Sequence, residues 1–186
     1  MRHFILFIAL FSIGLTTINA QNTGVAFELH YPLTMADKGN FATEVNGLLG
    51  GAVGFQISDN IDFNYGLKYK FDQLIFNTTY DNSQNVTRTS FMMHHVNGFG
   101  TYSINDTGTL KAVLEGGLSF YKYKKSNLQP SFFGFNISPG LNLEFRNQFY
   151  LFLNYSFIKT KLKRRQTGFI ENEKMNTVRL GVGFKL

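Results

Sequence analysis

The chain has 186 residues and a formal net charge of +6, with 18 glycines, 21 phenylalanines and 9 tyrosines but no cysteine or tryptophan. This length fits one domain, and the lack of cysteine excludes both a disulfide scaffold and a lipid-modified amino-terminal cysteine. A net charge this small does not indicate nucleic acid as a partner, and we expect none.

Residues 1–20, MRHFILFIALFSIGLTTINA, have the pattern of a secretory signal peptide that is cleaved after Ala20. The basic residues Arg2 and His3 precede an apolar run from Phe4 to Leu15. That run is shorter than the roughly 20 residues that a helix needs to span a bilayer. We therefore expect export, removal of residues 1–20, and one β-barrel domain over residues 21–186.

The rest of the chain is dominated by stretches in which large apolar residues alternate with polar or small ones. A period of two is typical of β-strands with one apolar face. In chain order the apolar faces run from Val25 to Leu33, Leu49 to Ile57, Ile61 to Phe71, Leu110 to Phe120, Phe133 to Phe145, Phe149 to Phe157 and Val178 to Leu186. An eighth stretch, residues 90–104, has a muddled alternation, so we expect a bulge or a mixed interior there.

The links between these stretches alternate in length. Tight turns are expected near residues 58–60, 105–108 and 146–148, and longer polar links at about 34–46, 77–89, 122–131 and 160–174. Short turns at one end, long loops at the other and an even number of strands are typical of outer-membrane barrels. Both ends of the domain then lie on the short-turn side, which corresponds to the periplasm.

Strand length and glycine placement indicate which face meets lipid. Many stretches reach ten residues, whereas soluble strands usually have about 5 or 6 and tilted membrane strands need about 9 to 11. A closed eight-stranded barrel encloses only modest side chains. The face that carries the charges also carries the small residues Gly50, Gly54, Gly66, Gly134, Gly140, Gly181 and Gly183. The polar face is therefore predicted to be the inside, which argues against a soluble ligand-binding barrel and favours an all-β, eight-stranded, antiparallel, up-and-down transmembrane β-barrel.

Charges of both signs on the inner face predict an ion-pair network that plugs the lumen, because a buried unpaired charge is costly. The predicted members are Glu28, Lys68, Lys111, Glu115, Glu144, Arg146 and Arg179, and Lys185 lies on the same face. A hairpin centred near residues 127 and 128 would bring Lys111 close to Glu144. Closure of the sheet would bring Arg179 toward Glu28, subject to the stagger of the barrel.

From Gln21 to Leu186 the sequence resembles the small outer-membrane β-barrel proteins of Gram-negative bacteria, of the OmpA transmembrane domain and OmpX type. The Ala20-Gln21 junction and the ending VRLGVGFKL are most similar to the outer-membrane β-barrel domain proteins of Bacteroidetes, which include the PorT-like group. The resemblance implies a location in the outer membrane and a final strand that the barrel assembly machinery recognises. That signal would consist of Val178, Leu180, Val182, Phe184 and Leu186, with a leucine in place of the usual terminal aromatic residue.

Two basic clusters lie on the long-loop side, where lipopolysaccharide phosphates would be suitable partners for them. The first consists of Lys122, Lys124 and Lys125, and the second of Lys161, Lys163, Arg164 and Arg165, with Lys159 at the base of the same hairpin top. The alternative is a solvated rim that keeps the strands from sinking into lipid. Candidates for aromatic girdles at the membrane interfaces are Tyr31, Tyr69, Tyr121, Tyr123 and Tyr155.

Neither a metal site nor a catalytic motif is evident. His94 and His95 are neighbours on one strand and point to opposite faces, so they cannot share an ion with the usual spacing of ligands. Lipid A deacylases of this shape use a His-x-Ser pair, which the chain lacks, although a set such as Ser90 with His94 could assemble through space.

We therefore expect a non-enzymatic protein without a cofactor that acts through its surface loops in envelope integrity, adhesion or surface interaction. Its expected partners are outer-membrane lipid, lipopolysaccharide, the barrel assembly machinery and surface or secretion-system proteins. The alternatives are a lipid-modifying enzyme of the outer membrane, or a small pore or secretion-assembly component.

Overall fold

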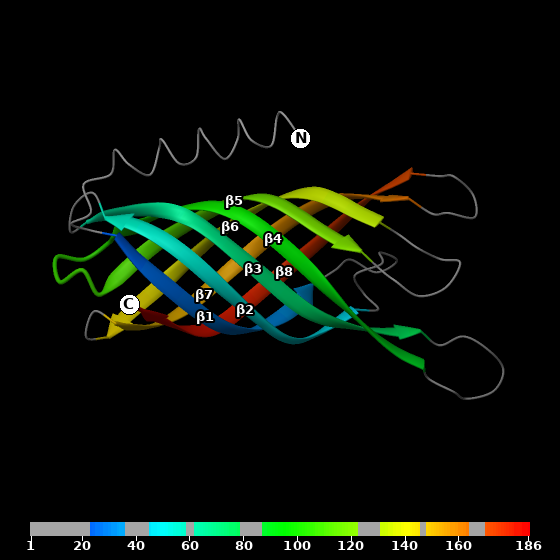
Figure 1. Ribbon diagram of the computed structural model, residues 1–186, viewed down its shortest axis with the longest axis horizontal. Helices are drawn as coiled ribbons and strands as arrows, with labels where there is room; N and C mark the ends of the chain where they lie inside the picture. Colours follow the sequence, from blue (N-terminus) through cyan, green and yellow to red (C-terminus); the bar gives the residue numbers. More distant parts are fainter. Residues whose placement is uncertain are drawn as a thin grey trace, which may run out of the picture.

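Eight antiparallel strands form a closed barrel in the computed structural model, which describes residues 23–35, 45–58, 62–78, 87–122, 131–145, 148–163 and 170–186 (Figure 1). The strands are β1 (Thr23–Met35), β2 (Val45–Ser58), β3 (Phe63–Thr78), β4 (Thr87–Ser103), β5 (Leu110–Lys122), β6 (Ser131–Phe145), β7 (Phe149–Lys163) and β8 (Ile170–Lys185). Each strand pairs with the next, and β1 pairs with β8. The predicted fold is confirmed. Within the described residues, no helix is long and apolar enough to cross a membrane.

The barrel has two distinct ends. The start of β1, the end of β8 and the β4–β5 turn lie together at the left of Figure 1, and this end is called the short-turn end. The opposite end, called the long-loop end, differs from the prediction at its last link. The expected loop over residues 160–174 is shorter, because β7 and β8 pair from Lys159↔Lys174 up to Lys163↔Ile170. In the sequence, residues 159–163 (KTKLK) and 170–174 (IENEK) are mostly polar, so no period of two marks them as strands.

Two prolines mark the places where the strand ladder is interrupted. Pro32 cannot donate a ladder hydrogen bond. The pairing of β1 with β2 extends to His30↔Gly50, and β2 has an irregularity between Gly47 and Leu49. A Cβ atom on Gly47 would lie only 1.4 Å from the Pro32 carbonyl oxygen, so only glycine allows this approach. Beyond that point the backbone pairing of β1 continues on its other side, where β8 pairs with it from Ala26 to Met35, and the Thr34 hydroxyl still donates to the Val45 carbonyl of β2. Pro139 similarly falls in a gap in the β6–β7 pairing.

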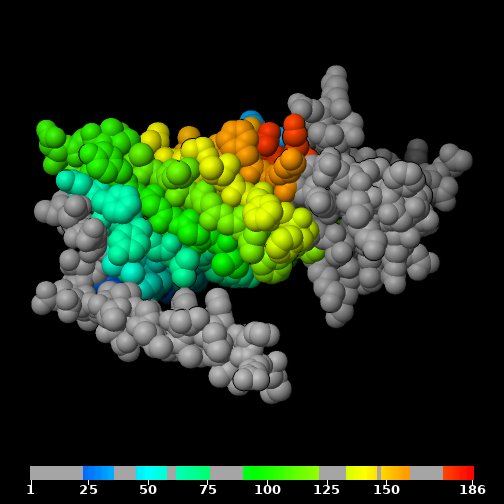
Figure 2. Space-filling model, turned by 90° about the horizontal axis from the view of Figure 1, so that it is seen from above, coloured from blue at the N-terminus to red at the C-terminus, as the bar shows by residue number. Residues whose placement is uncertain are grey.

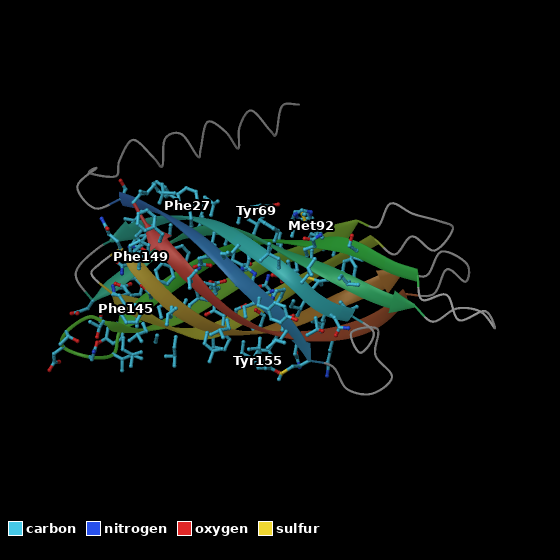
Figure 3. The ribbon with its side chains drawn as sticks, turned by 90° about the horizontal axis from the view of Figure 1, so that it is seen from below. Phe27, Tyr69, Met92, Phe145, Phe149 and Tyr155 are labelled. Atoms are coloured by element: carbon cyan, nitrogen blue, oxygen red, sulfur yellow. The ribbon has the colours of Figure 1, made fainter. Side chains whose placement is uncertain are left out.

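The outer wall is apolar and the inner face is polar, as the alternation predicts. Phe27, Tyr69, Phe145 and Phe149 project from the outside of the ribbon in Figure 3, and each is 44–57% exposed apart from any lipid. Figure 2 shows side chains from β3 to β7 forming a continuous surface on one side of the barrel. This apolar outer wall and the closed sheet make the chain a transmembrane barrel.

The stretch with muddled alternation forms β4 and contains no bulge in its pairing with β3 or β5. It has a mixed interior instead, because Phe91, Met93 and Phe99 face inward together with polar neighbours. The prediction that Tyr121 belongs to an aromatic girdle is wrong. Tyr121 is 4% exposed and packs inside the barrel against Phe91, with ring centroids 4.7 Å apart.

Candidate functional site

The lumen contains most of the chain's unusual chemistry, starting with a group of buried charges around Glu115. This carboxylate is fully buried and accepts hydrogen bonds from Lys68 at 2.7 Å and from Lys70 at 2.5 Å. Lys68 also donates to Glu28 at 2.6 Å, and the Tyr150 hydroxyl donates to the same Glu28 oxygen at 2.8 Å. We call these five residues the Glu115 network. Its two carboxylates face two ammonium groups, so the network is neutral overall.

A second group surrounds Asp72, nearer the long-loop end. The Arg179 Nε atom lies 3.1 and 3.0 Å from the two Asp72 carboxylate oxygens. The ring nitrogens of His30 and His95 lie 2.7 and 3.1 Å from the same carboxylate. We call these four residues the Asp72 network. Every charge-bearing group in it is buried, so each depends on the others for compensation.

The Asp72 network corrects one prediction, that sheet closure would bring Arg179 toward Glu28. The register of β1 and β8 pairs Glu28 with Gly183 and Pro32 with Arg179. Arg179 therefore lies four residues farther toward the long-loop end, where Asp72 of β3 is its partner. The stagger of the barrel sets this distance, and the strand pattern alone does not contain it.

The short-turn end of the lumen has an excess of positive charge. Glu144 lies 3.2 Å from Lys111, the neighbour expected from the β5–β6 hairpin, and also forms an ion pair with Lys185. The Lys185 ammonium lies 5.4 Å from the centre of the Tyr150 ring. Arg146, the remaining predicted member of the network, lies outside the described residues.

An apolar layer fills the lumen at the long-loop end, above the Asp72 network. It consists of Val45, Leu74, Phe91, Met93, Tyr121, Ile158 and Met175, all no more than 6% exposed. Six strands contribute to it. The sequence does not predict this layer, because outside residues 90–104 the large side chains are expected on the outer face. The available signal was that Phe91 and Met93 share the parity of His95 and Asn97, which face inward. Polar networks and an apolar layer together therefore fill the lumen.

Ser119, His95 and Asp72 form a hydrogen-bonded chain like that of a catalytic triad. The Ser119 hydroxyl lies 2.7 Å from His95 Nδ1, and His95 Nε2 lies 3.1 Å from Asp72. All three residues are no more than 1% exposed, Asp72 is already bound by Arg179, and Asn136 donates to the Ser119 hydroxyl. Because no substrate carbonyl can reach this hydroxyl, we interpret these hydrogen bonds as structural and not catalytic.

The two adjacent histidines point to opposite faces, as predicted. His95 faces the lumen, whereas His94 faces outward between Tyr69 and Phe120, with its Nδ1 atom 2.6 Å from the Tyr69 hydroxyl. The partner of His94 is thus Tyr69, and Ser90 lies two outward positions before His94 on the same strand. Within the part of the chain that the structure describes, no group of three or more His, Cys, Asp or Glu could hold a metal ion.

The other predicted residues lie at the ends of the chain or of the strands. The proposed assembly signal follows the outward face of β8, where Leu180, Val182 and Leu186 are 60%, 52% and 74% exposed. Of the basic clusters, Lys122 ends β5 and Lys161 and Lys163 lie on β7. The side chains of these three lysines lie outside the described part of the structure. The same holds for the whole of residues Tyr123, Lys124, Lys125, Arg164 and Arg165, and for the expected signal peptide, residues 1–20.

Solved structures with the same architecture are small outer-membrane proteins. Ail, the attachment invasion locus protein of Yersinia pestis, is 15% identical with a TM-score of 0.56, over 89% of this chain and 98% of that one. Neisserial surface protein A is 14% identical with a TM-score of 0.52, over 88% and 97%. The amino-terminal barrel domain of Pseudomonas aeruginosa OprF is 15% identical with a TM-score of 0.51, over 88% and 97%.

At these identities the likeness shows the fold alone. Ail has also been solved in complex with the heparin analogue sucrose octasulfate. No family model matches the chain, and no curated protein matches its sequence.

Proposed function

We propose that this chain, built on the fold of the small outer-membrane barrels, is an exported, non-enzymatic and non-conducting protein of the bacterial outer membrane. Its work is done by the segments at the long-loop end, which face the cell exterior, in attachment, surface interaction or envelope integrity. The observation that carries this proposal is the filled lumen, in which the Glu115 and Asp72 networks lie beneath the apolar layer.

A filled lumen argues against a pore because an ion would have to pass both barriers. It would displace the buried partners of Glu115 and Asp72, which are 2.5–3.1 Å from their carboxylates. It would then cross the apolar layer, in which the Tyr121 hydroxyl is the one side-chain oxygen or nitrogen among seven side chains, so most of its hydration shell would not be replaced. The lumen therefore serves as a rigid support, and the exposed ends are left to carry the function.

Anionic sugars and lipopolysaccharide are the partners that the composition of the long-loop end favours. The second basic cluster, Lys161, Lys163, Arg164 and Arg165, sits where β7 turns into β8. Clustered basic side chains bind sulfate and phosphate by charge-assisted hydrogen bonds. The binding of a polysulfated sugar by Ail, a barrel of the same architecture, supports the same class of ligand for this protein.

Membrane location is tested by cell fractionation with comparison of gel mobility before and after boiling. We expect the protein in the outer-membrane fraction, with a folded form that migrates differently from the boiled form. A soluble periplasmic protein with a single mobility would contradict the proposal.

Polyanion binding is tested with a variant in which the four residues of the second basic cluster are changed to glutamine. We expect weaker binding to lipopolysaccharide and heparin, and retained binding in a matched variant that exchanges lysine and arginine at the same positions. Unchanged binding in the glutamine variant would leave only a solvated rim.

A further inference from the structure

Two lysines on the outer wall stand out from the rest of the barrel surface. Among strand residues whose side chains the structure describes, Lys159 of β7 and Lys174 of β8 are the only lysine, arginine, aspartate or glutamate residues that face outward. Both are exposed. The other described charges of the strands lie in the lumen, paired as above. These two therefore need a different explanation from the lumen networks.

Lys159 and Lys174 are direct cross-strand partners in the β7–β8 ladder. Side chains in such pairs have Cβ atoms about 5 Å apart, and like charges placed opposite each other destabilise a sheet. A single anion between the two ammonium groups would turn this repulsion into attraction on both sides. The pairing thus provides two converging hydrogen-bond donors for one phosphate-sized anion.

Aromatic residues flank the lysine pair beside it on β6 and on its membrane side along β7. Phe135, the β6 partner of Lys159, is 68% exposed and packs edge-on against Phe133, with centroids 6.4 Å apart. Phe157, two residues before Lys159, is 49% exposed and packs against Tyr155 at 4.6 Å. Tyr155 is labelled on the outside of the barrel in Figure 3. This arrangement combines an apolar wall with a cationic top, which is the polarity of a lipid that has an anionic head and acyl tails.

We propose that Lys159 and Lys174 together bind a phosphate of a phosphorylated glycolipid of the outer leaflet, with its acyl chains packed along Phe135 and Phe157. This inference rests on the proposed function, because it needs the barrel in the outer membrane with its long-loop end outward. It goes beyond the loop clusters, since the site is on the strand wall and would hold a lipid beside the barrel.

The chemistry favours a glycolipid of the lipid A type over an ordinary phospholipid. A zwitterionic phospholipid carries its own ammonium group, which would be repelled by two adjacent lysines. The phosphates of lipid A sit on a sugar backbone without a neighbouring cation. In the proposed orientation, the long-loop end lies in the outer leaflet, which is where this glycolipid is found. Phosphatidylglycerol, which is anionic but has no sugar backbone of this kind, becomes an arm of the test.

The experiment measures binding of diphosphoryl lipid A to the full-length folded barrel in detergent micelles by native mass spectrometry. The test variant is Lys159→Gln/Lys174→Gln, and the matched control is Lys159→Arg/Lys174→Arg, which keeps both charges and donors. We expect the glutamine variant to bind diphosphoryl lipid A at least about tenfold more weakly than the original protein, because charge-assisted hydrogen bonds are lost. The arginine variant should bind like the original protein, and lipid A stripped of its phosphates should bind weakly to all three.

Three results would overturn the inference. These are equal binding by the glutamine variant, equal binding of lipid A without phosphates, and phosphatidylglycerol that competes as well as lipid A. A gel-mobility shift on boiling verifies that each variant is folded. The failure of this inference is distinct from failure of the proposed function, because neither the membrane fraction nor the closed lumen depends on Lys159 or Lys174.

Discussion

Replacement of Asp72 by asparagine should strongly destabilise the barrel. Asp72 is fully buried, and its carboxylate is bound by Arg179, His30 and His95. The substitution keeps the shape of the side chain but leaves the Arg179 guanidinium, 1% exposed, without its counter-charge. Breaking a buried ion pair by removal of one partner typically costs about 3–5 kcal/mol. The expected loss in the free energy of unfolding is in that range.

The loss is measured by urea unfolding of the barrel in lipid vesicles, followed by far-UV circular dichroism because the chain has no tryptophan. A second variant, Asp72→Asn/Arg179→Met, removes the uncompensated charge as well. We expect its loss in the free energy of unfolding to be smaller than the sum of the losses in the two single variants by about 1–3 kcal/mol, as for residues of one network. The control Asp106→Asn lies in the exposed β4–β5 turn and should unfold like the original protein. Equal stability of Asp72→Asn and the original protein would refute the reasoning.

Two further predictions concern the last strand. Gly183→Val should destabilise the barrel or prevent its folding, because a Cβ atom there would lie 2.1 Å from the Tyr150 ring. Gly54→Ala should be tolerated, because its Cβ atom would meet nothing nearer than 3.7 Å. The urea midpoints of the two variants test this, and equal midpoints would contradict it. Deletion of residues 178–186 removes the pairing of β8 with both β1 and β7, so we expect degraded or periplasmic protein in cell fractions, and a heat-modifiable barrel in the outer membrane would count against the assembly signal.

The strand number, the two ends and the facing of the side chains were predictable from sequence because they depend on local alternation. Gly66 and Lys68 share one parity and Tyr65 and Leu67 the other, and this relation survives any choice of partner strand. The inward face of Lys111 and Glu144 and their proximity followed from one hairpin. Such predictions need only neighbouring strands.

The pairing across the lumen was not predictable because it depends on the shear of the closed barrel. Arg179 meets Asp72, which is 107 positions away in sequence, and no local pattern gives that distance. Asp72 continues the parity of Lys68 and Lys70. The sequence does not indicate it as an inward residue, because the next position is Gln73 instead of an apolar residue and the alternation ends there. The apolar layer was overlooked for the converse reason, since Leu74 and Met93 break the rule that large residues face outward.

Conductance in a planar lipid bilayer tests the central claim most directly, because the claim is that the lumen is closed and the function lies outside it. The purified barrel would be compared with a general porin in the same bilayer and salt. The account predicts no discrete current steps from folded, heat-modifiable protein at voltages where the porin conducts. Reproducible unitary steps that vanish after boiling would show an open lumen and contradict the account.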